Sequence, residues 1–389
     1  MTLSFDGLRP PCPHFDDTHE AWRRSVRGFI DKEIMPHVEA WEMAGRIPRD
    51  LFQKAATAGL IGPGFPTEYG GHGTEFDRFH AIITSEELAR IGAGGISSAL
   101  MIHGIGLPPI MALGTEAMKQ TIGREVLSGQ NQISLGITEP SAGSDVAQLK
   151  TKAVKEGNGW RVNGSKTYIT GGMTSKWLTT AVRTGGAGMG GISLMLIDLD
   201  SAGVSRTELP KQGWWASDTA TLHFDDVFVP ADNLIGTENQ GFYGIMANFN
   251  GERLGMAAQA AAFARVCVSD AYAWASVRKT FGKRLADHQV IRHKFASMAQ
   301  RVWATTTMLD TYAWHVQEGH TPVAELAMLK VQATETLDYC AREAMQILGG
   351  SGFIRGHRIE RIYREVRVMA IGGGSEEIMR DLAARQLKL

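Results

Sequence analysis

One stretch of the chain, Ser134 to Gly172, constrains the fold more than any other. It begins as a short apolar run, turns at Glu139-Pro140 and crosses a loop of small and hydroxyl residues, Ser141 to Ser144. Two alternating segments follow, and the turn signals at 157–159 and 163–164 predict two hairpins. Such a loop packs no core, but its backbone N–H groups and hydroxyls can approach an anionic or heteroaromatic ligand closely. On composition alone the stretch predicts a β-domain with an ordinary surface loop, and a ligand-binding loop is the alternative.

Helical patterns precede and follow this β-rich region. Asp17 and Glu20 form a capping-type start for the first helix, after an arm at 1–15 that its three prolines predict to be extended. Further helices are predicted, in chain order, at 49–58, 74–90, 94–113, 241–279, 288–318, 322–348 and 376–387. Between them, from Ile133 to about Gly236, short runs alternate with turns and predict a small barrel.

The pattern divides the chain into an N-terminal helical domain at 1–132, a central β-domain at 133–240 and a C-terminal helical bundle at 241–389. A length of 389 residues fits two or three domains. The glycine-rich run at 185–191 precedes a strand-like run instead of a helix, so it predicts a flexible hairpin loop and not a dinucleotide-binding turn.

Composition narrows the class of protein. The chain is 43% hydrophobic and 21% charged, with a net charge of −1, which gives no attraction to nucleic acid or to an anionic membrane. Its three cysteines are scattered and have no metal-ligand spacing, as expected in a reducing compartment. No apolar run is long enough to span a membrane, and the N-terminus resembles neither a secretory signal nor a transit peptide. We expect a bacterial cytosolic protein, or a mitochondrial matrix protein if the source is eukaryotic.

Two sets of motifs about 200 residues apart resemble one known family. The first set is ITEPSAGSD, LKTKA and NGSKTYITGG, and the second is QILGGSGF, IERIYREVRV and IGGGSEEIMR. Both resemble the signatures of the acyl-CoA dehydrogenases, and the resemblance extends from about Asp16 to the end of the chain. It implies helices, then a β-barrel, then a four-helix bundle, with FAD as the cofactor.

The resemblance assigns the isoalloxazine contacts of FAD to the first set of motifs. The expected contacts are Leu135, Gly136, Ile137, Thr138, Ser144, Tyr168, Ile169 and Thr170. Thr138 is expected at the pyrimidine edge or N5, and Ser144 near both the flavin phosphate and the substrate. Many members have Trp where this chain has Tyr168, so an aromatic ring is kept.

In this family the nucleotide end of FAD is bound across subunits. The matching residues are Arg278, Phe281, Gln289, Gln346, Gly349 and Gly350. The resemblance implies two further cofactor contacts in the last motif, Ser375 and Glu377. An arginine such as Arg278 suits the pyrophosphate, because its planar fork binds phosphate oxygens in a bidentate way.

The family chemistry needs a carboxylate that removes the α-proton of the acyl thioester while a hydride leaves the β-carbon. The position that holds this carboxylate in many members is Gly373 here. In the isovaleryl-CoA and long-chain subfamilies the base instead precedes an arginine earlier in the chain, where this sequence has Glu252-Arg253. We therefore expect Glu252 to be the base, with Glu376 and Glu377 as the competing carboxylates.

The substrate contacts implied by the resemblance are Ser144, Tyr243, Asn250, Arg253, Gly373 and Gly374. Segments 94–109 and 242–246 are candidates to line the acyl pocket, although their apolar composition also suits ordinary core. The expected substrate is a branched or medium-to-long acyl-CoA, and no metal is expected.

The resemblance implies an FAD-dependent acyl-CoA dehydrogenase that forms a homotetramer, a dimer of dimers, and passes electrons to an electron-transferring flavoprotein. The alternatives are an acyl-CoA oxidase or a flavin monooxygenase of the same fold, or a non-catalytic acyl-CoA-binding member.

Overall fold

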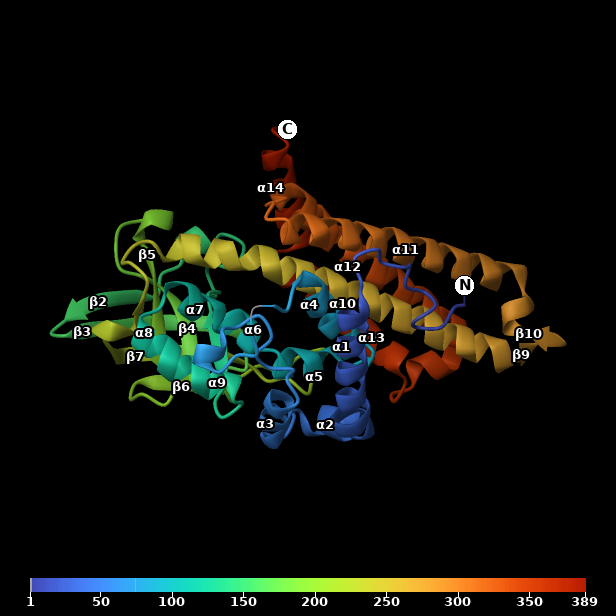
Figure 1. Ribbon diagram of the computed structural model, residues 1–389, viewed down its shortest axis with the longest axis horizontal. Helices are drawn as coiled ribbons and strands as arrows, with labels where there is room; N and C mark the ends of the chain where they lie inside the picture. Colours follow the sequence, from blue (N-terminus) through green and yellow to red (C-terminus); the bar gives the residue numbers. More distant parts are fainter. Residues whose placement is uncertain (1, 74) are drawn as a thin grey trace. The chain divides into compact units, whose positions relative to one another are not determined.

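The computed structural model describes residues 2–73 and 75–389, without the side chains of 247–250. Packing groups the chain into two compact units (Figure 1). Unit 1 combines Met1–Glu39, Phe76–Gly94 and Asn250–Leu389, and unit 2 combines Ala40–Glu75 and Gly95–Phe249. The boundaries differ from the three sequence segments, because two helices of the N-terminal segment pack with the C-terminal ones.

Unit 1 is built from long helices. They are α1 (Asp17–Phe29), α4 (Arg78–Ala89), α10 (Gly241–Val277, which enters this unit at Asn250), α11 (Gln289–Gln317), α12 (Val323–Leu348), α13 (Arg358–Ile371) and α14 (Glu376–Gln386). A short hairpin, β9 (Lys279–Thr280) and β10 (Lys283–Arg284), connects α10 to α11. Helix α12 packs against α11, α13 and α14, so it forms the centre of this bundle.

The start of the first helix differs by one residue from the prediction. Asp16, not Asp17, is the N-cap, because its carboxylate accepts hydrogen bonds from the backbone N–H groups of Thr18 (2.9 Å) and His19 (3.1 Å). Helix α13 was not among the predicted helices. Its buried Ile359, Ile362, Val366 and Met369 recur at helical spacing.

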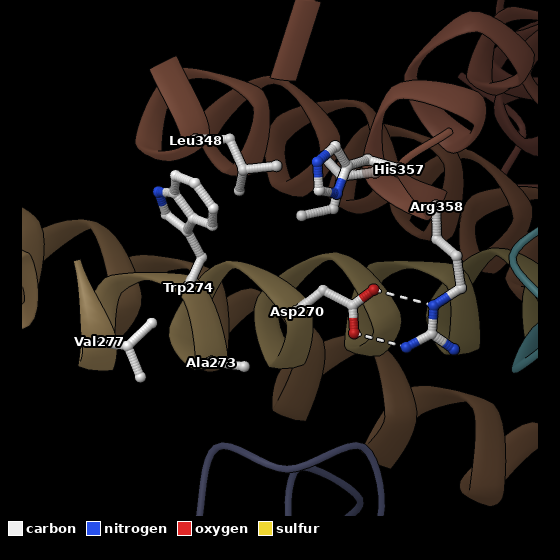
Figure 2. A pocket seen from close by; sticks show the side chains of 8 residues that line it. Asp270, Ala273, Trp274, Val277, Leu348, His357 and Arg358 are labelled. Carbon is white, nitrogen blue, oxygen red and sulfur yellow. Dashed lines mark hydrogen bonds and ion pairs between the residues drawn. The ribbon is translucent and has the colours of Figure 1, made fainter. Parts of the chain in front are cut away.

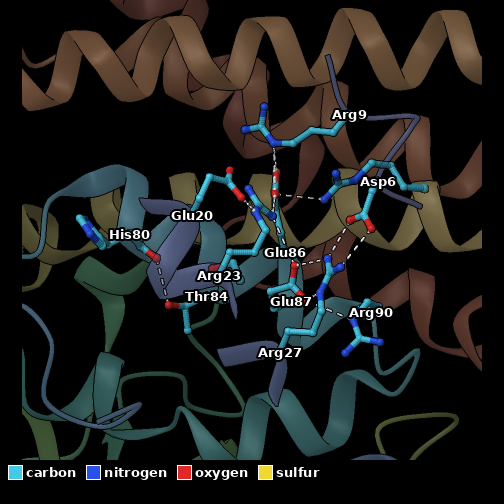
Figure 3. A network of polar contacts seen from close by, with 12 residues as sticks. Asp6, Arg9, Glu20, Arg23, Arg27, His80, Thr84, Glu86, Glu87 and Arg90 are labelled. Carbon is cyan, nitrogen blue, oxygen red and sulfur yellow. Dashed lines mark hydrogen bonds and ion pairs between the residues drawn. The ribbon is translucent and has the colours of Figure 1, made fainter. Parts of the chain in front are cut away.

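The N-terminal arm is folded, not extended as the prolines suggested. Leu8 is fully buried, and the Arg9 guanidinium donates to the Glu86 carboxylate (2.8 Å) and to the Asp310 carboxylate (2.8 Å). Asp6 accepts two hydrogen bonds from Arg27 (Figure 3). The arm therefore connects to α4 and α11 through the buried pairs of Arg9 and to α1 through the exposed pair of Asp6.

Unit 2 begins with short helices and continues as a mixed sheet. Its helices are α2 (Val38–Ala44), α3 (Asp50–Thr57), α5 (Gly94–Leu100), α6 (His103–Gly106), α7 (Pro108–Leu113), α8 (Glu116–Met118) and α9 (Arg124–Leu127). The single helix predicted at 94–113 is thus divided into three. Pro108 and Pro109 lack the N–H donors that a continuous helix would need there.

The sheet has eight strands. They are β1 (Ile133–Gly136), β2 (Lys152–Glu156), β3 (Gly159–Thr170), β4 (Trp177–Arg183), β5 (Ile192–Asp198), β6 (Val204–Glu208), β7 (Thr219–Pro230) and β8 (Leu234–Ile235). Their order is β6-β7-β3-β2-β4-β5-β8, with β1 added in parallel to β4. The structure therefore has a mixed sheet where a barrel was predicted. Among the described residues, β6 and β8 lie at the two ends of the strand order.

One of the two predicted hairpins is present. Strands β2 and β3 form the hairpin that turns at 157–158. Asn163-Gly164 is a bulge inside β3, where the pairing with β7 shifts register between Val162 and Gly164. Gly164 has φ +145°, and a Cβ there would lie 2.7 Å from the Thr151 Cα. Backbone crowding therefore explains the glycine better than a turn does. The run at 185–191 connects the antiparallel strands β4 and β5, as predicted.

Candidate active site

The predicted flavin segment starts on β1 in unit 2. Leu135 and Gly136 pair with Thr179 and Thr180 of β4 in parallel register. After the strand, Glu139 and Ala142 exchange backbone hydrogen bonds of 3.0 and 3.1 Å, which close the predicted turn at Pro140. Small and hydroxyl residues then continue the loop, and Ser144 is exposed.

A buried ion pair holds this loop against β3. The Lys166 ammonium donates to the Glu139 carboxylate (2.8 Å) and to the carbonyl of Ile137 (3.1 Å). Glu139 also accepts from the backbone N–H groups of Lys150 (2.6 Å) and Thr151 (2.9 Å). Burial raises the pKa of Glu139, but attraction to Lys166 and these hydrogen bonds outweigh it and leave the pKa lowered. The carboxylate therefore stays ionised as the anchor of the loop.

Sequence reasoning missed Lys166 as a structural residue of the site. Hydropathy places a lysine at the surface, yet this side chain is fully buried. The sequence offered one indication of its role. Lys166 lies between two predicted flavin segments, and the first motif contains a glutamate, Glu139, that could pair with it.

Tyr168 has an unusual backbone conformation. Its φ is +59°, which is rare for an aromatic residue, and its side chain is 71% exposed. The neighbouring Thr167 donates its N–H to the carbonyl of Thr138 (2.9 Å), so the two predicted flavin segments lie side by side. Ile169 is buried, and the Thr170 carbonyl accepts from the Ser134 hydroxyl (2.7 Å). A large aromatic ring held in a strained, exposed position is typical of a ligand contact.

The residues predicted for the nucleotide end lie in unit 1 and are exposed. Arg278 directly follows α10, and Phe281, 98% exposed, occupies the turn between β9 and β10 with φ +50°. Gln289 is the first residue of α11, whereas Gln346, Gly349 and Gly350 lie at the end of α12. His288 supports the hairpin, because its Nε2 contacts the Thr280 hydroxyl (3.1 Å).

A pocket of about 340 Å³ is lined by residues that are neighbours in sequence of this group (Figure 2). Its α10 wall ends at Val277, next to Arg278, and its opposite wall begins at Leu348, next to Gly349. The remaining lining residues are Asp270, Ala273, Trp274, His357, Arg358 and Ile359. Asp270 accepts two hydrogen bonds from Arg358, of 2.6 and 2.9 Å, which fix one side of the pocket. No motif in the sequence predicted this pocket.

The predicted base and the vacated position lie close together in unit 1. Glu252 is half-buried on α10, and Met256 is one turn further along the same face. Gly373 packs against Met256, because a Cβ at Gly373 would lie 2.7 Å from the Met256 Sδ. Gly373 and Gly374 have φ +66° and +103°, values that favour glycine. The sequence predicted that the base has moved from position 373 to position 252. Met256 is one helical turn from Glu252 and packs against Gly373, so it relates the two positions.

Burial raises the pKa of Glu252 to about 7, and the adjacent Arg253 lowers it only in part. A carboxylate with this pKa can accept a proton near neutral pH, which is what a general base requires. Arg253 is buried beside it, and burial lowers the pKa of Arg253 despite the Glu252 charge.

The competing carboxylates have structural contacts. Glu376 accepts a hydrogen bond from the Thr334 hydroxyl (2.8 Å) of α12. Glu377 is exposed in the first turn of α14, and backbone hydrogen bonding and the Ser375 hydroxyl lower its pKa. Ser375 caps this helix by accepting from the N–H of Ile378 (3.4 Å). Glu377 therefore lacks the raised pKa of Glu252.

The remaining predicted substrate contacts are divided between the units. Tyr243 is exposed near the start of α10 in unit 2, where its ring packs edge-on against Phe242. The side chain of Asn250 lies outside the described residues. Segment 94–109 forms α5, α6 and the start of α7.

One group of potential metal ligands is present in unit 1. His19, Asp77 and His80 have ligand atoms within 4.8 Å of one another. Asp77 is the N-cap of α4, accepting from the N–H groups of Phe79 (2.9 Å) and His80 (3.0 Å), and it contacts both imidazoles. Helix capping therefore accounts for these contacts without an ion.

Among the described residues, no single helix has both the length and the apolar composition of a membrane span, although the bent pair Gly94–Leu100 and His103–Leu113 meets both together.

Comparison with known families covers nearly the whole chain. Models of the N-terminal, middle and C-terminal domains of acyl-CoA dehydrogenases match residues 16–130, 134–227 and 239–388. The chain belongs to the acyl-CoA dehydrogenase family. It is an oxidoreductase and a flavoprotein by that membership, as the motifs predicted.

Individual acyl-CoA dehydrogenases agree with this assignment. Acyl-CoA dehydrogenase AFT10-1 of Alternaria alternata is 39% identical over 97% of this chain and 93% of its own. The mitochondrial long-chain specific acyl-CoA dehydrogenase of Sus scrofa is 34% identical over 96% of this chain and 87% of its own. The crystal structure of a probable acyl-CoA dehydrogenase from Mycobacterium abscessus has a TM-score of 0.94 and 45% identity, over 96% of this chain and 99% of that one.

Proposed function

We propose that this acyl-CoA dehydrogenase binds FAD and converts a branched or medium-to-long-chain acyl-CoA to the trans-2-enoyl-CoA. The observation that carries the proposal is Glu252, a half-buried carboxylate with its pKa raised to about 7, one helical turn from the methionine that packs on Gly373. Three long-chain specific relatives at 33–34% identity support a substrate longer than butyryl-CoA.

The residues present fit a flavin dinucleotide. Tyr168 offers an exposed ring in a strained conformation beside Thr138, and Arg278 offers an exposed guanidinium to a pyrophosphate. Thr138, Tyr168 and the loop to Ser144 would hold the ring system. Arg278, Phe281 and Gln289, with Gln346 to Gly350, would hold the nucleotide. When bound, FAD supplies the hydride acceptor.

Glu252 does the acid–base work in this proposal. Its ionised carboxylate takes the α-proton from the thioester and becomes a neutral acid, while the β-hydrogen leaves as hydride with its electron pair. A half-buried site favours this step, because the carboxylate is less well solvated as an ion and gains more by accepting a proton. A side chain at Gly373 would collide with Met256, which is consistent with a base that comes from α10 instead.

The exposed nucleotide residues support a shared cofactor site. We propose a homotetramer, a dimer of dimers, in which a second copy completes the nucleotide site, and an electron-transferring flavoprotein as the electron acceptor. Phe281, almost fully exposed next to Arg278, is the kind of residue that a second subunit would cover.

An anaerobic titration tests the proposal. The purified protein is expected to be yellow with about one FAD per chain, and to lose its flavin absorbance with acyl-CoAs of C8 and longer or with branched ones. Bleaching fastest with butyryl-CoA would refute the substrate class, and no bleaching with any acyl-CoA would favour a non-catalytic member. Oxygen consumption with acyl-CoA alone would favour an oxidase.

A charge variant tests the cofactor site. Arg278→Ala should weaken FAD retention by about 1.5–3 kcal/mol, the contribution of a hydrogen bond to a charged group. Arg292→Ala, on exposed helix surface of the same unit, is the control. Equal retention in both variants would count against Arg278.

A further inference from the structure

The turn that carries Gly373 has almost no side chains of its own to fix its position. It connects α13 to α14 through three glycines at 372–374 and through Ser375, the N-cap of α14. Two of its φ angles are left-handed, and such a turn is conformationally free unless other groups hold it. Whatever fixes this turn also fixes Gly373 relative to Met256 and the Glu252 face of α10.

Lys330 of α12 holds this turn from inside the bundle. Its ammonium donates to the carbonyl of Ala370 (2.9 Å), in the last turn of α13, and to the carbonyl of Gly374 (2.8 Å). The two bonds bracket the turn on both sides. The Lys330 side chain is fully buried, so these carbonyls replace much of the water that the charge would otherwise bind.

A second residue on the same face of α12 extends the contact. Thr334, four residues after Lys330, donates its hydroxyl to the Glu376 carboxylate at the start of α14. Lys330 and Thr334 therefore fix the turn and the following helix from one helical face. On its other side, the turn meets α10 at Met256, through Gly373.

We propose that Lys330 is a positioning residue for the dehydrogenation: its buried ammonium holds the glycine turn at the distance from α10 that places substrate against Glu252. The proposal rests on the proposed function, because Glu252 is the base there. Lys330 acts through the turn and touches no reacting atom.

The charges around Lys330 make the hold pH-dependent. Glu376 and Glu377 of α14 favour its ammonium form, whereas burial and Arg253 of α10, next to Glu252, disfavour it. Burial is the largest influence and lowers the pKa of Lys330 to about 8. As pH rises through this value the ammonium becomes a neutral amine, whose hydrogen bonds to the two carbonyls are weaker. Flavin reduction should therefore decline above about pH 8, after rising through the pKa of Glu252.

Three variants test the proposal by anaerobic stopped-flow reduction across pH. Lys330→Met keeps the apolar stem and removes the charge, so it should slow reduction by about 10²-fold, the effect of a small misplacement, and abolish the alkaline decline. Lys330→Arg keeps a charge that does not titrate, so its rate should stay level above pH 8. Lys294→Met is the matched control, a lysine of the same unit that pairs with Glu343 away from the turn.

Hydrogen exchange gives a readout that does not depend on activity. Peptides covering 371–376 should exchange at least about 10-fold faster in Lys330→Met, since two hydrogen bonds to a charged group are lost. The same peptides should be unchanged in Lys294→Met. If the wild-type protein reduces no flavin, the proposed function fails, but exchange still decides whether Lys330 holds the turn.

The results that would overturn the proposal are specific. Wild-type rate with an unchanged alkaline decline in Lys330→Met would do so, as would equal exchange in the two Met variants. If Lys330→Met does not fold, an alkaline decline that persists in Lys330→Arg would overturn it instead.

Discussion

Two glutamates on helices of the same unit have opposite protonation chemistry. Glu86 of α4 is 2% exposed, and Glu252 of α10 is half-buried. Burial alone would raise both pKa values. For Glu86, attraction to Arg265, Arg9 and Arg23 outweighs burial and lowers the pKa to about 2 (Figure 3). For Glu252, burial outweighs its neighbour Arg253 and raises the pKa to about 7.

The difference shows that the arrangement of cations, not depth of burial, separates the pKa of the structural carboxylate Glu86 from that of Glu252, the proposed base. Glu86 is ionised at every physiological pH and so cannot exchange a proton during turnover. Glu252 changes protonation near neutrality, which suits a base that must both accept and release a proton. The more deeply buried carboxylate is therefore the less reactive one.

The largest expected effect is on chemistry. Glu252→Gln keeps the shape of the side chain but cannot accept the proton, so flavin reduction should slow by about 10²–10⁴-fold. FAD content and the flavin spectral shift on acyl-CoA binding should remain. Single-turnover reduction measures this, and Glu376→Gln should slow reduction less. Reduction of Glu252→Gln at near wild-type speed would transfer the role to Glu376.

Removing the other glutamate should instead affect stability. Glu86→Gln leaves three arginines around a neutral side chain, which should lower the free energy of unfolding by about 3–5 kcal/mol. The rate of reduction per bound FAD should not change. Glu335→Gln, which breaks an exposed pair with Arg380, should cost at most about 1 kcal/mol in the same urea titration. Equal costs would mean that the buried network contributes no more than a surface pair.

The pH dependence of stability should have opposite sign at the two positions. The folded pKa of Glu86 lies below its ordinary value of 4.5, so its contribution is full above 4.5 and is lost as pH falls toward 2. The folded pKa of Glu252 lies above 4.5, so stability is lost as pH rises from 4.5 through 7.

Glu252→Gln should therefore stabilise the protein at pH 8.5, by up to about 3 kcal/mol, and leave it nearly unchanged at pH 5. Urea unfolding at both pH values measures this. A variant equally stable with wild type at pH 8.5 would show that Glu252 ionises there without cost.

The smallest expected effect concerns the packing of Gly373 against Met256. Gly373→Ala puts a side chain at φ +66° and 2.7 Å from the Met256 Sδ, which should cost about 1–3 kcal/mol of stability. Gly186→Ala, in an open loop, should change stability by no more than about 0.5 kcal/mol. Adding Met256→Ala should recover the part of the cost that comes from contact. No recovery would assign the whole cost to the backbone.

Much of the fold could be predicted from periodicity and motif strings. The long helices α10, α11 and α12 end within two residues of their predicted bounds, because their apolar spacing is regular. The single helix at 94–113 and the hairpin at Asn163-Gly164 were wrong for a shared reason. Proline and glycine indicate an interruption, but only tertiary neighbours such as Thr151 decide whether it becomes a turn, a break or a bulge.

The candidate site was predicted only in part. Motif matching named Glu252 and Gly373, and the structure gives them a common neighbour in Met256. Motif matching could not identify Lys166 or Lys330 as buried residues. Hydropathy places a lysine at the surface, and its burial depends on hydrogen-bond acceptors that are far away in sequence. The assignments of individual flavin and substrate contacts stay predictions.

The bond between Arg9 and Asp310 spans 301 positions of the chain. At a synthesis rate of about 5–20 residues per second, Asp310 is made roughly 15–60 s after Arg9. Arg265, the other deeply buried cation beside Glu86, is also made late. Unit 1 therefore cannot close its charge network until most of the polypeptide has left the ribosome. The strands of unit 2 are all synthesised before residue 240. This sheet can therefore form before Asp310, the partner of Arg9, has been synthesised.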